Sequence, residues 1–408
     1  MGRRDEREPP ATSSRARRRR ARPIKMSRGS SARRDPSRKG ETAHALLFLE
    51  EGMSRFSAGD FPGAINSWEK ALELEPDLFE AWNNLGKARE ASGQHGEAIR
   101  AYHRATEIAQ EQHEPWFNLG NAEDSSGDYA AAVAAYQRAV ELEPNMFEAW
   151  NNLGNAQVHL GNLEEAVTCY RRALDIHPGL YETWFNLGNT WADLHQMDQA
   201  IDAYRHALEI RPDAYQVLYN MGFAHASRGD FARAMEEYRR ASTLAPNDYE
   251  VWYNLGNVCL DLGFHGQAVE AYGKALEHHR KDHEVWNNLG NALAQQRRHS
   301  EAISSYQQAL QLKPDYDVSW NNLGNVLDER GDLEAASRAY ERATTLAPDQ
   351  PTYHLNRASV LARRGDVDSA VEHLVQALAL SPELRHFVPG FAEFAPLLDH
   401  PKLLSCKE

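Results

Sequence analysis

The chain has 408 residues, 42% of them hydrophobic, and a net charge of −14. Its three cysteines, Cys169, Cys259 and Cys406, are scattered, which excludes a disulfide framework and a cysteine metal cluster and is typical of a reducing compartment. No apolar run approaches the roughly 18–20 residues that a membrane-spanning helix needs. The N-terminus has no apolar signal-peptide core, so we expect a cytoplasmic, soluble protein.

The charge is divided unevenly along the chain. Residues 1–40 carry 15 Lys or Arg against 4 acids, a net of +11, and the remaining residues, 30 basic and 55 acidic, carry −25. The first 40 residues are rich in Arg, Ser and Pro and have few large apolar residues, so they are predicted to be a disordered basic tail. Clustered arginines could contact nucleic acid or serve as a localisation signal. We favour a solvated tail, or a start assigned too early with Met26 or Met53 downstream.

One short motif returns along the chain at a fixed spacing of 34 residues. It reads Trp, any residue, Asn, Leu, Gly, and it begins at Trp82, Trp116, Trp150, Trp184, Trp252, Trp286 and Trp320. With this tryptophan at position 4, residues 45–384 divide into ten units that start at residues 45, 79, 113, 147, 181, 215, 249, 283, 317 and 351. Repeated units pack only on their neighbours, so we expect one long array instead of several globular domains.

The first half of each unit is predicted to be a helix that ends at position 15. Glycine stands there in eight units, as in Gly161 and Gly229, and glycine readily adopts the left-handed conformation after a helix. His195 and Arg297 replace it in the other two, and we expect those turns to close in another way.

The second half of each unit is predicted to be a helix with one apolar face. Alanine at positions 20 and 27 and an aromatic residue at position 24, as in Ala166, Ala173 and Tyr170, lie on one face because they are separated by four and three residues. Proline at position 32 ends this helix in eight units. The exceptions there are Gln110 and Arg280.

The combined pattern of Trp, Leu, Gly, Ala, Tyr, Ala and Pro resembles the tetratricopeptide repeat over about five-sixths of the chain. The resemblance implies an all-α, right-handed α-solenoid of about ten helix-turn-helix units. Phe48, Leu218 and His354 depart from Trp at position 4. Residues 385–408 are expected to cap the last unit, with Phe387, Phe391 and Phe394 at helical spacing and an interruption at Pro389 and Gly390. Docking of a peptide, or dimerisation, on those aromatics is the alternative.

Asparagine recurs in the first helix at positions that the hairpin does not require. A mediocre helix former repeated in mid-helix indicates another role, and side-chain amides can pair with the backbone of an extended peptide. Bonding between neighbouring units is the alternative role. The candidate peptide-binding residues are, at position 6, Asn84, Asn118, Asn152, Asn186, Asn220, Asn254, Asn288, Asn322 and Asn356 and, at position 9, Asn121, Asn155, Asn189, Asn257, Asn291 and Asn325.

This asparagine ladder is similar to that of the tetratricopeptide arm of protein O-GlcNAc transferases, where the family's ladder binds the main chain of extended substrates. The resemblance extends to the position 6 series and fails in the first unit, which has Glu50. It implies, as an alternative function, a substrate-recruiting component of a protein glycosylation system whose catalytic module is a separate chain.

Acidic residues share the predicted inner face, so we expect a basic or neutral partner segment. A charge at the start of the helix, favourable with the helix dipole, is the other explanation for those at position 2. Only Lys87 is basic at position 9, which disfavours a basic clamp for a C-terminal carboxylate. The acids are Glu80, Glu114, Glu148, Glu182, Glu250 and Glu284 at position 2 and Asp193, Asp261 and Glu329 at position 13.

The pattern predicts a non-enzymatic scaffold that binds an extended polypeptide. No nucleophile motif or phosphate-binding loop is present, and we expect no cofactor. His278, His279 and His283 cluster at one turn but lack partners that would complete a metal site. Homo-oligomerisation is left open, as is autoinhibition, in which residues 15–34 occupy the acidic face.

Overall fold

The computed structural model describes residues 36–404. The tail prediction for residues 1–35, the autoinhibitory segment and Cys406 lie outside the described residues. The tail was predicted to extend to residue 40, but the first helix already begins at Pro36. The same uninterrupted helix forms the first half of the first unit.

All regular elements of residues 36–404 are helical, and α1 to α20 form ten successive hairpins. The odd-numbered helices correspond to the first half of a unit and the even-numbered helices to the second half. Their bounds are α1 (Pro36–Ser57), α2 (Phe61–Leu74), α3 (Phe79–Ala91), α4 (His95–Ile108), α5 (His113–Ser126), α6 (Tyr129–Leu142), α7 (Phe147–His159), α8 (Leu163–Ile176), α9 (Tyr181–Asp193), α10 (Met197–Ile210), α11 (Tyr215–Ser227), α12 (Phe231–Leu244), α13 (Tyr249–Asp261), α14 (His265–His278), α15 (His283–Gln295), α16 (His299–Leu312), α17 (Asp317–Glu329), α18 (Leu333–Leu346), α19 (Pro351–Arg364), α20 (Val367–Leu380) and α21 (Pro401–Leu404).

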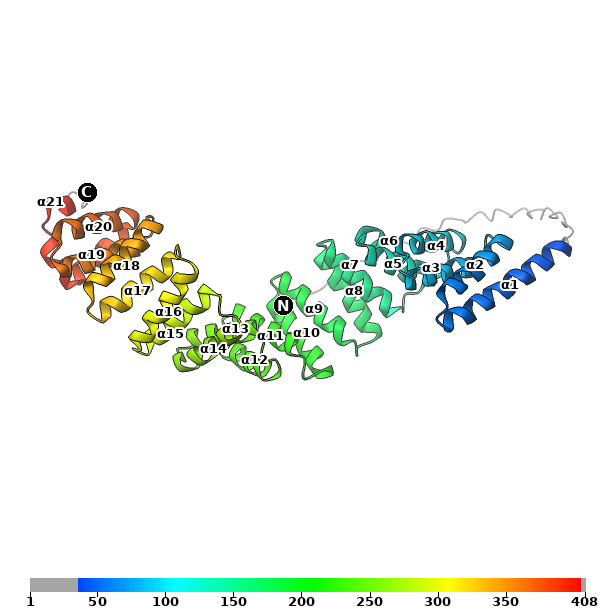
Figure 1. The fold of residues 1–408 in the computed structure, drawn as a ribbon, viewed down its shortest axis with the longest axis horizontal. Helices are drawn as coiled ribbons and strands as arrows, with labels where there is room; N and C mark the ends of the chain where they lie inside the picture. The colour runs from blue at the N-terminus through cyan, green and yellow to red at the C-terminus, as the bar shows by residue number, and fades with distance from the viewer. Residues whose placement is uncertain (1–35, 405–408) are drawn as a thin grey trace, which may run out of the picture.

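The hairpins stack into an elongated, curved array, with α1 at one end and α21 at the other (Figure 1). Each helix contacts its neighbours in sequence most extensively, and each odd-numbered helix also touches the next odd-numbered one. The protein is therefore an all-α solenoid of helix-turn-helix units. No helix among residues 36–404 is long and apolar enough to cross a membrane.

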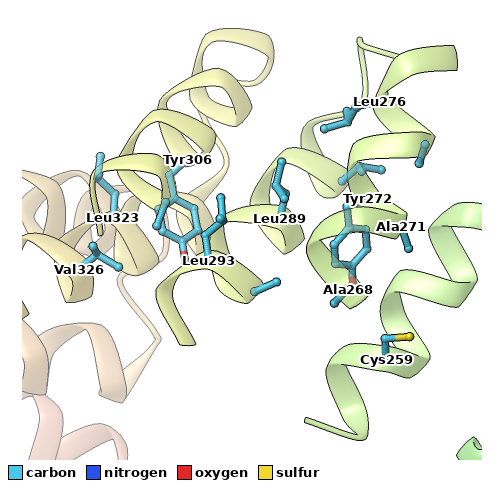
Figure 2. Packing of buried hydrophobic residues seen from close by; sticks show 14 of the residues in the cluster. Cys259, Ala268, Ala271, Tyr272, Leu276, Leu289, Leu293, Tyr306, Leu323 and Val326 are labelled. Atoms are coloured by element: carbon cyan, nitrogen blue, oxygen red, sulfur yellow. The ribbon is translucent and has the colours of Figure 1, made fainter. Parts of the chain in front are cut away.

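Within nine of the ten hairpins, the aromatic residue at position 24 packs on a glycine at position 8, and in the last hairpin Leu374 and Ala358 take these positions. Figure 2 shows two of these buried rings, Tyr272 and Tyr306, among the apolar residues of one cluster. A Cβ added to Gly154 would lie 2.6 Å from a ring carbon of Tyr170, closer than any real side chain allows. The missing side chain thus lets the two helices approach until the ring lies against the backbone.

The turn between the helices of a unit adopts the left-handed conformation in all ten units. The eight glycines at position 15 have φ between 76° and 85°, as predicted. The expectation that His195 and Arg297 close the turn differently is wrong, because both have φ of 58°. The packing of the two helices in each hairpin requires this conformation, and His195 and Arg297 adopt it although it is sterically unfavourable for residues with a side chain.

The tryptophan at position 4 packs between helices and also holds the connection between consecutive units in place. Its indole N–H donates to the backbone carbonyl six residues earlier at 2.8–3.2 Å in all seven units that carry it. Gln110 and Arg280 accept this bond in place of proline, so the turn does not depend on the proline. His354 substitutes for tryptophan through its Nε2, 3.0 Å from the Pro348 carbonyl oxygen.

The segment after α20 covers the apolar end of the array. It forms three short 3-10 helices, η1 (Pro382–His386), η2 (Val388–Gly390) and η3 (Ala392–Leu397), followed by α21. Phe394 is fully buried against α19 and α20, whereas Phe387 and Phe391 are 63% and 41% exposed. The three phenylalanines do not share one helix, because Pro389 and Gly390 break the segment into separate turns, as the sequence predicts.

Candidate peptide-binding face

The asparagines at positions 6 and 9 lie together on the odd-numbered helices, and we call this surface the amide face. All fifteen predicted residues are half-buried, neither enclosed in the core nor fully solvated. Stacking of the units brings them together, because successive members belong to successive odd-numbered helices from α3 to α19. The array thus aligns side chains that are far apart in the sequence.

The position 9 asparagine links the two helices of its own unit to the next unit. The Asn155 Oδ1 accepts a bond of 2.7 Å from the Tyr170 hydroxyl and one of 3.1 Å from Asn186 Nδ2 in the following unit. The buried tyrosine therefore has its hydroxyl satisfied, and the amide holds two units in register. The same arrangement recurs at Tyr136–Asn121–Asn152, Tyr204–Asn189–Asn220, Tyr272–Asn257–Asn288, Tyr306–Asn291–Asn322 and Tyr340–Asn325–Asn356.

These bonds use only part of the hydrogen-bonding capacity of each amide. Within the described chain, Asn155 and Asn189 spend their Oδ1 but donate to nothing through Nδ2, and Asn186 Oδ1 accepts no bond. A side-chain amide offers two donors and an acceptor oxygen. The structural role in the stack is therefore established by geometry, and it leaves donors and acceptors for a ligand.

Near the N-terminal end the pattern changes because Lys87 replaces asparagine at position 9. Lys87 Nζ pairs with Glu114 at 2.7 Å, and this bond lowers the pKa of the Glu114 carboxyl. Asn118 Nδ2 bonds Asn83 Oδ1 at 2.8 Å, so a position 5 residue takes over the link between units. Asn84 forms no hydrogen bond with the described residues.

The sixth unit also departs from the pattern, since Phe223 replaces asparagine at position 9. This phenylalanine is 50% exposed among the amides. Asn254 Nδ2 instead bonds the Tyr219 hydroxyl at 3.1 Å, and burial raises the pKa of Tyr219 to about 12. The sequence does not predict that Phe223 belongs to this face, because the exposure of one apolar side chain cannot be inferred from its residue type. The interruption of the asparagine series at position 9 is the signal that the sequence does contain.

A cavity of about 480 Å³ opens on the amide face across α5, α7 and α9. Its lining combines amides with two carboxylates, Asp124 from α5 and Asp193 from α9. The full lining is Asp124, Asn155, Val158, His159, Tyr170, Asn186, Asn189, Thr190 and Asp193.

Asp124 is the second residue that the sequence analysis missed, because it stands at position 12 beside the predicted acidic positions. Its Oδ1 is buried without a hydrogen-bond partner in the described chain. Burial raises the pKa of this carboxyl, and nearby His159 opposes the rise. Asp193 is exposed on the other side of the cavity, so a donor entering between them would meet two acidic groups.

Of the predicted position 2 acids, two form ion pairs. Glu114 pairs with Lys87, and Glu182 pairs with Arg211 at 3.3 Å. Within the described chain the other four form no ion pair and are exposed, namely Glu80, Glu148, Glu250 and Glu284. These four carboxylates therefore leave uncompensated negative charge on the amide face.

The described residues contain no group of three or more His, Cys, Asp or Glu side chains placed to hold a metal ion. This applies to the histidine cluster at residues 278–283 as well. Cys169 and Cys259 are buried free thiols, and burial raises the pKa of Cys169 to about 11. A thiol with so high a pKa is a poor nucleophile near neutral pH.

The repeated hairpins and the inter-unit amide bonds define a helical-repeat protein with an amide-lined face. Tetratricopeptide repeat family models match residues 52–93, 77–143, 117–181, 181–214 and 351–376. The model described as "Cilia and flagella-associated protein 70 C-terminal domain" matches residues 215–353. This chain is a tetratricopeptide repeat protein.

Several solved structures are similar to parts of the chain. The MamA crystal structure is 26% identical, covers 43% of this chain and 96% of its own, and has a TM-score of 0.40. YrrB, described as "a TPR protein with an unusual peptide-binding site", is 23% identical with coverage of 49% and 99% and a TM-score of 0.43. The Naa15/Naa10 complex bound to HypK-THB is 15% identical with coverage of 89% and 67% and a TM-score of 0.45. A sequence comparison with curated proteins found no match.

Proposed function

We propose that the protein is a non-enzymatic scaffold that binds an extended, basic or neutral polypeptide along its amide face. The observation that carries this is the unspent hydrogen-bonding capacity of Asn155, Asn186 and Asn189 around one cavity. Donors and acceptors repeated from unit to unit suit a main chain, which also repeats its N–H and C=O groups.

The acids at the cavity add a preference for positive charge. Asp124 and Asp193 lie on helices on either side of α7, so a peptide crossing the amides would meet a carboxylate at each side. Selectivity would then come from lysine or arginine side chains, while the amides bind the backbone regardless of sequence.

The decisive variant is Asn155→Asp combined with Asn189→Asp. Aspartate keeps an oxygen where each Oδ1 accepts its two bonds, but it replaces the free Nδ2 donors with a second acceptor. We expect binding of an acetylated, amidated peptide of serine, glutamine and alanine to fall by roughly ten-fold or more, since two ligand hydrogen bonds are lost. A neutral peptide is used because added carboxylates would attract a basic one.

Tyr170→Phe is the matched control. It removes the Tyr170 hydroxyl bond to Asn155 and lowers stability, but it keeps every amide and carboxylate that lines the cavity. Equal peptide affinity for the wild type and the double aspartate variant, by calorimetry or fluorescence anisotropy, would contradict the proposal. Equal losses in the Tyr170→Phe and aspartate variants would show that only the stack is affected.

A second candidate is recruitment of substrates for a separate glycosyltransferase, which the nine-unit asparagine series favours. It requires the same amide face, so the aspartate variant should also weaken it. Copurification with a glycosyltransferase that modifies the bound polypeptide would support this function over a simple scaffold.

A further inference from the structure

A second cavity, of about 450 Å³, lies on the opposite face of α9 from the amides. Trp184, Leu187 and Trp191 line it and follow each other at spacings of three and four residues, so they share one helical stripe. Asn186 and Asn189 lie roughly half a turn away and line the cavity of the amide face. The two cavities are therefore separated by the helix.

The walls of this second cavity come from α8 and α10, which lie on either side of α9. We call it the tryptophan cavity. Its full lining is Arg171, Leu174, Asp175, Trp184, Leu187, Trp191, Gln199, Asp202, Ala203 and His206. Two indole rings, two carboxylates and two basic groups thus meet in one space.

Trp191 makes the tryptophan cavity different from the corresponding site in other units. It stands at position 11, where later units bury a smaller residue such as Leu293, Leu327 or Leu361. Trp191 remains half-buried, and its indole N–H has no hydrogen-bond partner among residues 36–404. The indole of Trp184, in contrast, is fixed by its bond to Pro178 and by its contact with the His206 ring at 4.4 Å.

A guanidinium already occupies the face of Trp191. The Arg171 guanidinium carbon lies 5.3 Å from the ring centroid, within the range of a cation–π contact. Arg171 is exposed and forms no ion pair in the described chain, so its guanidinium contacts the Trp191 ring and no carboxylate. The structure thus contains an example of the ligand chemistry that this ring accepts.

The two carboxylates complete a site for a cation. Asp202 is bonded to Arg205 at 2.8 Å, which compensates part of its charge. Asp175 is exposed and forms no ion pair in the described residues. A second guanidinium in this space would therefore find an aromatic face and an unpaired carboxylate, both favourable to it.

We propose that the tryptophan cavity binds an arginine side chain of a protein partner, which displaces Arg171 from Trp191 and pairs with Asp175. The site is independent of the amide face, because the two open on opposite faces of α9. A partner could engage it while a peptide occupies the asparagines.

The test follows the indole N–H signals of the isotopically labelled full-length protein by NMR during titration. The probe is acetyl-Gly-Arg-Gly-amide, and the same peptide with citrulline is its uncharged control. Trp191→Leu assigns the Trp191 signal and introduces the residue that three other units carry at this position. We expect the arginine peptide to shift the Trp184 and Trp191 signals and the citrulline peptide to leave them unchanged.

Arg171→Ala tests whether the ligand arginine must displace Arg171 from the Trp191 ring. Removing the competing guanidinium should tighten binding of the arginine peptide by roughly two- to five-fold, as expected for one exposed cation–π contact. Asp175→Asn should weaken it by a similar factor. Weaker binding in Arg171→Ala, or equal binding of the citrulline peptide, would overturn the assignment. Arg171 and Asp175 are exposed, so these two variants test the site even if Trp191→Leu is poorly folded.

Discussion

Substituting Gly154 with alanine tests whether close helix contact, rather than helix propensity, determines the stability of a unit. The new Cβ would meet Tyr170 ring carbons at 2.6 and 2.8 Å. This ring cannot retreat easily, because it is 1% exposed and its hydroxyl is bonded to Asn155 at 2.7 Å. The same substitution at Gly222 meets the Tyr238 ring at 2.9 Å, and the Tyr238 hydroxyl has no hydrogen-bond partner in the described chain.

The two substitutions should therefore differ in sign or size. Alanine gains about 1 kcal/mol over glycine in a helix interior, whereas overpacking costs typically about 1–3 kcal/mol. The anchored ring at Gly154 places the cost at the upper end, for a net loss of about 2 kcal/mol. At Gly222 the ring can shift by a few tenths of an ångström, and the net change should be near zero.

Hydrogen exchange of α7 and α8, compared with α11 and α12, measures the effect locally. A local probe is needed because a long repeat array need not unfold as one unit. Circular dichroism during urea denaturation provides the global measurement.

Equal protection in the Gly154→Ala and Gly222→Ala variants would refute the argument that the anchored ring sets the cost. A double variant, Gly154→Ala with Tyr170→Leu, reproduces the pair Ala358 and Leu374 of the last unit. It should recover part of the stability by removing the clash, although the hydroxyl bond to Asn155 is lost.

Two further predictions concern the backbone and the pH dependence of stability. His195→Gly should raise the free energy of unfolding by about 0.5–1 kcal/mol in urea denaturation, because the steric strain that glycine relieves exceeds the entropy cost of glycine. Gly229→Ala should lower the free energy of unfolding. A less stable His195→Gly variant together with a more stable Gly229→Ala variant would contradict the strain at φ 58°. Burial lowers the pKa of His373 to about 4, below the pKa of about 6.5 that histidine has in the unfolded chain. The neutral His373 therefore contributes to the free energy of unfolding above about pH 6.5, and this contribution is lost as the pH falls toward 4. His373→Gln should reduce the loss of α20 protection between neutral pH and about pH 4 by about 2 kcal/mol, and an unchanged pH profile would exclude His373 as its source.

The sequence alone determined the architecture, because its period directly specifies the unit. Glycine, alanine, tyrosine and proline at fixed positions predicted two helices, a left-handed turn and a short connection, and the helices and turns have this form. The sequence could not predict that His195 and Arg297 adopt the glycine conformation, because that is imposed by the packing of the hairpin. Nor could it show which phenylalanine of the cap is buried, since Phe394 is selected by the fit of separate turns on α19 and α20.

For the candidate site, the sequence identified the asparagines but not how their hydrogen bonds are divided. Only stacked units bring Asn155 Oδ1 to both Tyr170 and Asn186, which commits one end of the amide to the array and leaves the other end free. The tryptophan cavity likewise depends on three helices around Trp191. Periodicity fixes which residues share a helical face, but the satisfaction of each polar atom and the space between helices arise only when the units are packed together.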